Sequence, residues 1–147
     1  MKVIGIDPGK SGGIAIIEGR QLHGHIGLAK LTDREVWELL ARNEPALCVL
    51  EKVHASPQMG VTSSFTFGQS FGMIRMAVIA AGLRLEMVTP QTWQKSIGLK
   101  SIKAKLGSAE NKKRNKAMAQ ELFPGIKVTN ATADALLIAE YGRRISG

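Results

Sequence analysis

The sequence predicts an α/β protein in which a mixed sheet of five strands is flanked by helices. The first observation is a pair of short aliphatic runs, 3–6 and 46–50, which lack polar alternation and are therefore typical of strands buried on both faces. The second is a set of glycines and prolines that separates these runs from their neighbours. The third is apolar spacing of three and four residues in the stretches between, which is typical of helices.

The first predicted strand ends at an acidic residue. Pro8, Gly9, Gly12 and Gly13 break the strand directly after Asp7. A carboxylate at the end of a rigid strand suits a divalent cation, and the glycines would let a phosphate approach. Asp-Pro-Gly is also ordinary turn chemistry, so at this point Asp7 either opens a turn or binds a metal.

Two more strands and a helix follow. Gly13–Glu18 is the second strand, and a tight turn leads to a third strand through Leu28, which together predict an antiparallel meander. Thr32 and Glu35 form a capping box that starts a helix ending near Asn43. We expect Trp37 of this helix to lie in the core.

The fourth strand, Ala46–Leu50, repeats the pattern of the first. Its continuous hydrophobicity predicts a central strand parallel to the first one, and Glu51 follows at its end. If the two strands are neighbours, Asp7 and Glu51 lie side by side and repel each other. A bound cation would relieve that repulsion.

A polar loop, 52–62, leads to a long predicted helix over 63–82. Its core face repeats at helical spacing and comprises Phe67, Phe71, Ile74, Val78 and Ala81. Gly68 and Gly72 would allow another backbone to come close, whether that of the sheet, a second subunit or a nucleic acid. Met59 and Phe65 either fill a core or interface, or wedge between unstacked bases.

The rest of the chain predicts one strand and three helices. Arg84–Val88 is the fifth strand, and Pro90 starts a short helix. A helix capped by Ser108 runs to Phe123, and the last helix, 131–143, carries Asp134 in its first turn.

Length and composition indicate a single domain over residues 1–147. The length of 147 residues and 44% hydrophobic content suffice for one core. Cys48 is the single cysteine, which excludes a disulfide framework and a cysteine-based zinc site. No apolar run is long enough for a membrane span and no signal segment is visible, so we expect no membrane association. We expect a soluble intracellular protein.

The positive charge is concentrated in one segment. The net charge is +8, and residues 90–116 contain eight basic residues and one glutamate. Such a concentration favours a phosphate-contacting surface, although a solvated helix face has the same composition.

Three carboxylates from distant parts of the chain, Asp7, Glu51 and Asp134, stand in an order that looks like the ribonuclease H-like fold. The whole chain resembles the RuvC-type Holliday junction resolvases, in particular the compact phage-associated members. Five segments carry the resemblance, namely 5–9 (GIDPG), 50–53 (LEKV), 67–72 (FGQSFG), 107–110 (GSAE) with Lys112, and 132–139 (TADALLIA).

The resemblance implies a dimeric, Mg²⁺-dependent endonuclease that nicks opposing strands of a four-way DNA junction. It also implies a cytoplasmic protein of a bacterial cell or a phage-infected host, with an organelle as the alternative. Its catalytic and metal-binding residues would be Asp7, Glu51 and Asp134. Two Mg²⁺ ions would be held per active site, and Mn²⁺ would substitute for them. We expect a homodimer because a junction has approximate two-fold symmetry, with the face around Gly68 and Gly72 as the interface.

Other residues are candidates for DNA contact. Lysines position a strand through its phosphates without reading its sequence. The candidate DNA-binding residues are Lys95, Lys112, Lys113, Lys116, Lys52, His54 and Phe65.

The chain departs from the family pattern at two positions. Where many members have a fourth acid or a histidine, this chain has Ala131, so the triad suffices or Asn130, Glu140 or a water fills the place. Asn130 is the better candidate, as it would lie one helical turn back from Asp134. Where the family often has an aromatic wedge, this chain has His54, so Met59 or Phe65 would share that role.

Three alternative functions remain at the level of the sequence. The first is another ribonuclease H-like nuclease, either a YqgF-type RNA-processing enzyme or a general nuclease of branched DNA. The second is a junction-binding protein without catalysis, which the missing fourth acid would explain. The third is a sugar-kinase-like or actin-like phosphate-binding domain, for which the chain is short.

Overall fold

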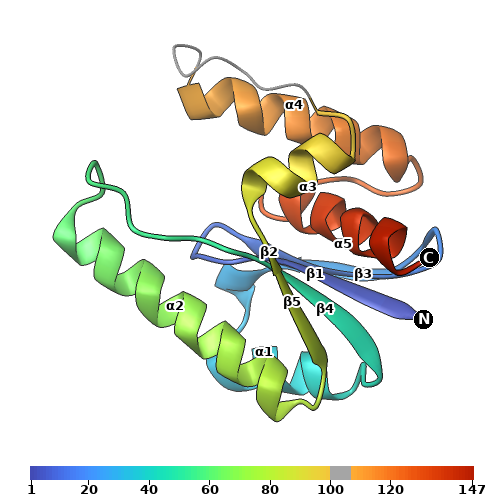
Figure 1. Ribbon diagram of the computed structural model, residues 1–147, viewed down its shortest axis with the longest axis horizontal. Coiled ribbons are helices and arrows are strands. Elements are labelled where there is room, and N and C mark those ends of the chain that lie inside the picture. The colour runs from blue at the N-terminus through green and yellow to red at the C-terminus, as the bar shows by residue number, and fades with distance from the viewer. Residues whose placement is uncertain (100–106) are drawn as a thin grey trace.

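The computed structural model describes residues 1–99 and 107–147 and arranges them as a sheet between two layers of helices (Figure 1). The strands are β1 (Lys2–Asp7), β2 (Gly13–Glu18), β3 (Gln21–Gly27), β4 (Ala46–Glu51) and β5 (Arg84–Val88). The helices are the 3-10 helix η1 (Leu28–Lys30), α1 (Asp33–Ala41), α2 (Val61–Ala80), α3 (Pro90–Ser96), α4 (Gly107–Leu122) and α5 (Ala133–Ser146). Each predicted strand and helix is therefore confirmed, with its ends shifted by at most three residues.

The sheet is mixed, as predicted, and its strand order is β3-β2-β1-β4-β5. The first three strands form the antiparallel meander, whereas β4 pairs in parallel with β1 on one side and with β5 on the other. Consequently β1, β4 and β5 end at the same edge of the sheet. Ligand sites of α/β proteins form at this kind of edge, beyond the carboxyl ends of parallel strands.

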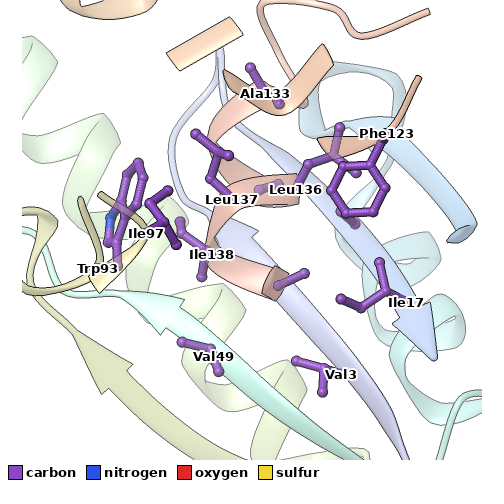
Figure 2. Close-up of a cluster of buried hydrophobic side chains, with 14 of the residues drawn as sticks. Val3, Ile17, Val49, Trp93, Ile97, Phe123, Ala133, Leu136, Leu137 and Ile138 are labelled. Atoms are coloured by element: carbon purple, nitrogen blue, oxygen red, sulfur yellow. The ribbon is translucent and has the colours of Figure 1, made fainter. Parts of the chain in front are cut away.

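Alternation along the strands divides the interior into two cores. Ile4 and Ile6 of β1 pack toward α1 and α2, which cover one face of the sheet. Val3 of β1 and Val49 of β4 pack toward α3, α4 and α5 on the other face, where Trp93 and Leu136 lie (Figure 2). The period of two in a strand explains why neighbouring residues serve different cores.

Helix α1 confirms its predicted start and corrects its predicted core residue. The capping box is present, because the Thr32 side chain accepts from the Glu35 backbone and the Glu35 side chain accepts from that of Thr32. Val36 and Leu40, four residues apart, form the buried stripe. Trp37 lies about 100° further around the helix and is 40% exposed, so the expectation that it belongs to the core is wrong.

Helix α2 packs on the sheet along part of its length only. Ile74 and Val78 are buried and Phe67 and Phe71 are partly buried, which confirms the predicted core face. In Figure 1 the N-terminal half of the helix extends past the edge of the sheet.

Two observations complete the fold. Lys100, Lys103 and Lys105 of the predicted basic segment lie outside the described residues. Within residues 1–99 and 107–147, the helices are too short or too polar to cross a bilayer.

Candidate active site

The sheet brings Asp7 and Glu51 to neighbouring positions. Both are the last residues of their strands, and the register pairs Ile6 of β1 with Leu50 of β4 immediately before them. Asp7 has the strand parity of Val3, and Glu51 has that of Val49, so both carboxylates lie on the face covered by α5. The predicted adjacency of the two acids is the geometry that the parallel pairing produces.

Asp134 reaches the same edge because α5 packs unusually close to the sheet. A Cβ on Gly5 of β1 would lie 2.2 Å from the carbonyl oxygen of Ala135. A Cβ on Gly13 of β2 would lie 2.4 Å from that of Ala131. Glycine is therefore required at both positions for the start of α5, and with it Asp134, to lie over the ends of β1 and β2.

The three carboxylates influence one another's ionisation. Burial raises the pKa of Asp7 well above its ordinary value, and the charges of Glu51 and Asp134 raise it further. Burial also raises the pKa of Glu51 to about 7, with a contribution from Asp134. Burial raises the pKa of Asp134 as well, and the charge of Lys112 partly opposes the rise for Asp134 and Asp7. The site is thus a partly desolvated cluster of like charges.

Two of the carboxylates are hydrogen-bonded to neutral donors. Trp93 Nε1 donates to Glu51 Oε2 at 2.7 Å, and Asn115 Nδ2 donates to Asp134 Oδ1 at 2.9 Å. Sequence reasoning did not identify either donor. The sequence offered one indication for Trp93, because a buried indole N–H usually requires a hydrogen-bond acceptor. No local sequence pattern marks Asn115 as a donor.

The donor set fits a hard divalent cation in its chemistry. Carboxylate oxygens are the ligands that Mg²⁺ prefers, and a cation among these acids would offset both their burial and their repulsion. With the side chains as they stand, no group of three or more His, Cys, Asp or Glu in residues 1–99 and 107–147 is arranged around one ion position. The carboxylates that carry the hydrogen bonds to Trp93 and Asn115 would therefore have to adjust around an ion.

The predicted DNA-binding residues lie on several elements around this edge. Lys112, Lys113 and Lys116 are exposed on α4, and Lys95 is exposed on α3. Of the three lysines on α4, Lys112 is the one whose charge acts on two of the carboxylates.

The other predicted contact residues lie on the segment after β4 and on α2. Lys52 and His54 are exposed on the segment after Glu51, and Phe65 is 69% exposed on α2. A groove of about 640 Å³ separates the turn after Asp7 from the N-terminal half of α2. Met59 and Phe67 form part of its lining. The Phe67 ring also leaves no room for a side chain at position 9 of this turn, because a Cβ on Gly9 would lie 2.7 Å from it.

The residues considered for a fourth ligand position lie in different surroundings. Asn130 lies in the turn before α5 rather than one turn back within the helix, and its side chain is exposed. Glu140 is bound by Arg143 and Arg144 at 2.7 Å each, so its carboxylate is already paired. Ala131 packs its methyl group near Gly27 of β3.

Two solved structures resemble the chain over almost its whole length. The RuvC of Thermus thermophilus matches with a TM-score of 0.68 and 20% sequence identity, covering 99% of this chain and 97% of that one. T. thermophilus RuvC in complex with a Holliday junction substrate matches with a TM-score of 0.69 and 19% identity, covering 99% and 96%. No family model and no curated protein matches the sequence. The chain therefore has the RuvC-like ribonuclease H fold that its motifs predicted.

Proposed function

We propose that the chain is a Mg²⁺-dependent endonuclease of branched DNA, with the four-way junction as its preferred substrate. The observation that supports this most is the meeting of Asp7, Glu51 and Asp134 at one edge of a RuvC-like sheet, where burial raises the pKa of all three. The charges of Glu51 and Asp134 raise the pKa of Asp7 further. Such a cluster costs the fold stability unless a cation offsets it. A cation held there is suited to phosphodiester hydrolysis.

The three carboxylates would hold the metal, with Mn²⁺ as a functional substitute for Mg²⁺. When bound, the metal would activate a water molecule and stabilise the leaving 3′ oxygen. The chain itself fixes the carboxylates at the ends of β1 and β4 and at the start of α5, which are rigid elements. Asn130, which is exposed in the turn before α5, stays the candidate for an additional ligand.

The proposed DNA contacts lie on both sides of the acids. Lys112, Lys113 and Lys116 on α4 and Lys95 on α3 would bind phosphates. His54 and Phe65 would stack on bases where the junction is unpaired. The structurally similar T. thermophilus RuvC has been solved with a Holliday junction substrate, which supports the choice of a branched substrate.

We also propose a homodimer that uses the exposed face of α2. Besides Phe65, which is proposed to contact DNA, the large exposed hydrophobic residues on this helix are Val61, Met76 and Ile79, at 88%, 61% and 54% exposure. Gly68 and Gly72 have open space beside them, so a second backbone could approach closely. Exposed apolar surface of this extent on one helix is typical of an interaction site.

The test is cleavage of three end-labelled substrates, namely a synthetic four-way junction, a linear duplex and a structured RNA, with Mg²⁺. We expect paired nicks in opposing strands of the junction and little cleavage of the other two. Equal cleavage of all three would contradict the junction preference, and cleavage of the RNA alone would favour an RNA-processing nuclease.

A first mutational prediction belongs to the same assay. Asp7→Asn should reduce cleavage by at least 10³-fold while junction binding stays within about threefold, because it removes a metal ligand and no phosphate contact. Glu121→Gln, at an exposed position of α4, is the control and should cleave normally. Unchanged cleavage by Asp7→Asn would mean that the carboxylate cluster does not carry the reaction.

A further inference from the structure

We propose that Trp93 and Asn115 are positioning residues of the carboxylate cluster. Each uses a neutral N–H donor to hold one oxygen of a metal-binding carboxylate and leaves the other oxygen for the cation. This inference rests on the proposed metal-dependent function and deepens it.

The position of the Trp93 indole is determined by the ends of two strands. The Lys52 backbone N–H, directly after Glu51, donates to the carbonyl oxygen of Val88 at 2.7 Å, which joins the ends of β4 and β5. Thr89 then caps α3 by accepting from the Thr92 backbone at 3.3 Å. One helical turn after the cap, the Trp93 side chain is fully buried next to Ile97 (Figure 2), in the same core cluster as Val49.

This burial makes the indole a rigid donor. A fully buried Trp93 cannot change rotamer without disturbing the core, so its Nε1, which lies 2.7 Å from Glu51 Oε2, is held in place at the end of β4. Glu51 is itself only 8% exposed. The hydrogen bond therefore determines which of its oxygens remains available.

Asn115 holds Asp134 in the same manner from α4. Its side chain is 3% exposed, and its Oδ1 accepts from Arg114 Nε and Nη2 at 3.1 and 2.9 Å. With the amide oxygen toward the guanidinium, the amide nitrogen must face Asp134. Arg114 Nη2 also donates to Gln94 Oε1 at 3.4 Å, next to Trp93. The two donors thus belong to one frame built by α3 and α4.

The neutrality of the donors distinguishes these acids from another buried acid of the same chain. Glu140 is 6% exposed, yet it binds the two positively charged groups of Arg143 and Arg144. Despite its burial, hydrogen bonds and charge from these arginines hold the pKa of Glu140 below its ordinary value. An indole or amide N–H offsets part of the desolvation cost but supplies no net positive charge to compete with a cation. Glu51 and Asp134 are oriented without being neutralised.

A purely structural role for Trp93 makes a different prediction. If the indole only fills the core and Glu51 only satisfies its N–H, then Trp93→Phe lowers stability and leaves metal affinity unchanged. If Trp93 positions Glu51, the same substitution weakens metal binding about tenfold or more, as is typical when a group that orients a metal ligand is removed.

The first measurement is the affinity of the full chain for Mn²⁺, followed by EPR of the free ion. We expect Trp93→Phe and Asn115→Ala each to bind Mn²⁺ at least tenfold more weakly than wild type, while junction binding in EDTA stays within about twofold. The matched controls are Trp37→Phe, which changes the half-exposed tryptophan of α1, and Asn111→Ala, one turn before Asn115. Affinities of Trp93→Phe and Asn115→Ala equal to those of the controls would overturn the proposal.

The second measurement is the indole N–H resonance of Trp93, followed by ¹H–¹⁵N NMR and assigned with Trp37→Phe. We expect it to lie downfield of the Trp37 resonance without metal, to move on adding Mg²⁺, and to lose that response in Glu51→Gln. An indole resonance of Trp93 that does not respond to saturating Mg²⁺ would contradict a contact with a metal-binding carboxylate.

A third variant covers the case in which Trp93→Phe does not fold. In the Trp37→Phe background, β-(3-benzothienyl)alanine at position 93 keeps the volume of tryptophan but replaces the N–H by sulfur. We expect it to fold and to lose Mn²⁺ affinity, whereas wild-type affinity would overturn the proposal. Absence of Mn²⁺ binding by wild type would contradict the proposed function itself, so the two failures are distinguishable.

Discussion

At the scale of single residues, Glu51 contributes to stability in a pH-dependent way. Burial raises the pKa of Glu51 from 4.5 to about 7 in the folded protein. The folded chain therefore binds a proton at Glu51 more tightly than the unfolded chain does between these pH values. This stabilisation is complete below about pH 4.5 and is lost as the pH rises through 7.

The corresponding prediction concerns the metal-free protein. In EDTA, the free energy of unfolding should fall by about 3 kcal/mol between pH 4.5 and pH 7.5 through Glu51, and Asp7 and Asp134 act in the same direction. Urea unfolding at a series of pH values measures it. Glu51→Gln should reduce the slope, and Mg²⁺ should raise stability more at pH 7.5 than at pH 5. A metal-free protein that becomes more stable over this range would contradict the desolvation of Glu51.

Residues also show what the sequence could predict about the site. Asp7 and Glu51 were predictable because an acid directly after an uninterrupted apolar strand must lie at the end of that strand. Trp93 and Asn115 were not, since their contacts depend on where α3 and α4 pack. Trp37 was misplaced for a related reason, because helical spacing defines a face but does not show how wide its buried part is.

At the scale of elements, the packing of α5 on β1 depends on the absence of a side chain at Gly5. Gly5→Ala would place a methyl group against the backbone of Ala135 and Ala139. We expect a loss of about 3 kcal/mol in the free energy of unfolding, at the upper end for overpacking, together with loss of cleavage because Asp134 moves. Gly24→Ala in β3, where the new methyl group meets open space, is the control for thermal unfolding. Similar melting temperatures for both variants would contradict the close packing.

The exposed basic face of α4 predicts a salt dependence. The logarithm of junction affinity should fall linearly with the logarithm of salt concentration, with a slope of about −0.9 per neutralised phosphate on the duplex arms. Lys113→Ala should make the slope less negative by about 0.9. Lys127→Ala, beyond the end of α4, should leave it unchanged. Identical slopes in titrations of both variants and wild type would mean that α4 does not contact phosphates.

The elements themselves were largely predictable. Capping at Thr32, proline at position 90 and glycine breaks mark boundaries locally, and alternation gives the strands. Residues 131 and 132, which lie in the turn before α5, were predicted as helix, since nothing in the sequence distinguishes the start of α5 at Ala133 from one two residues earlier.

At the scale of the whole molecule, the proposed homodimer predicts a defined response to substitution on α2. Met76→Lys should convert the protein to a monomer in light-scattering chromatography, because a charge would be buried at the interface. Met87→Lys, which changes another exposed methionine, on β5, should leave the dimer intact. The monomeric variant should nick a single strand of the junction at a time, losing paired nicks. A wild-type monomer at concentrations that support paired cleavage would contradict the dimer.

The packing of the last helix on the first strand has a consequence for biosynthesis. During synthesis β1 and β4 leave the ribosome early, and α5 leaves it last. This helix supplies both the residues that complete the core on its face of the sheet and the third carboxylate, Asp134. Until α5 packs on the sheet, no helix covers Asp7 and Glu51 on that face, and Asp134 is not beside them. Nascent or truncated chains that end before Ala133 should therefore be unable to cut DNA, so the proposed cleavage activity would arise only when folding is finished.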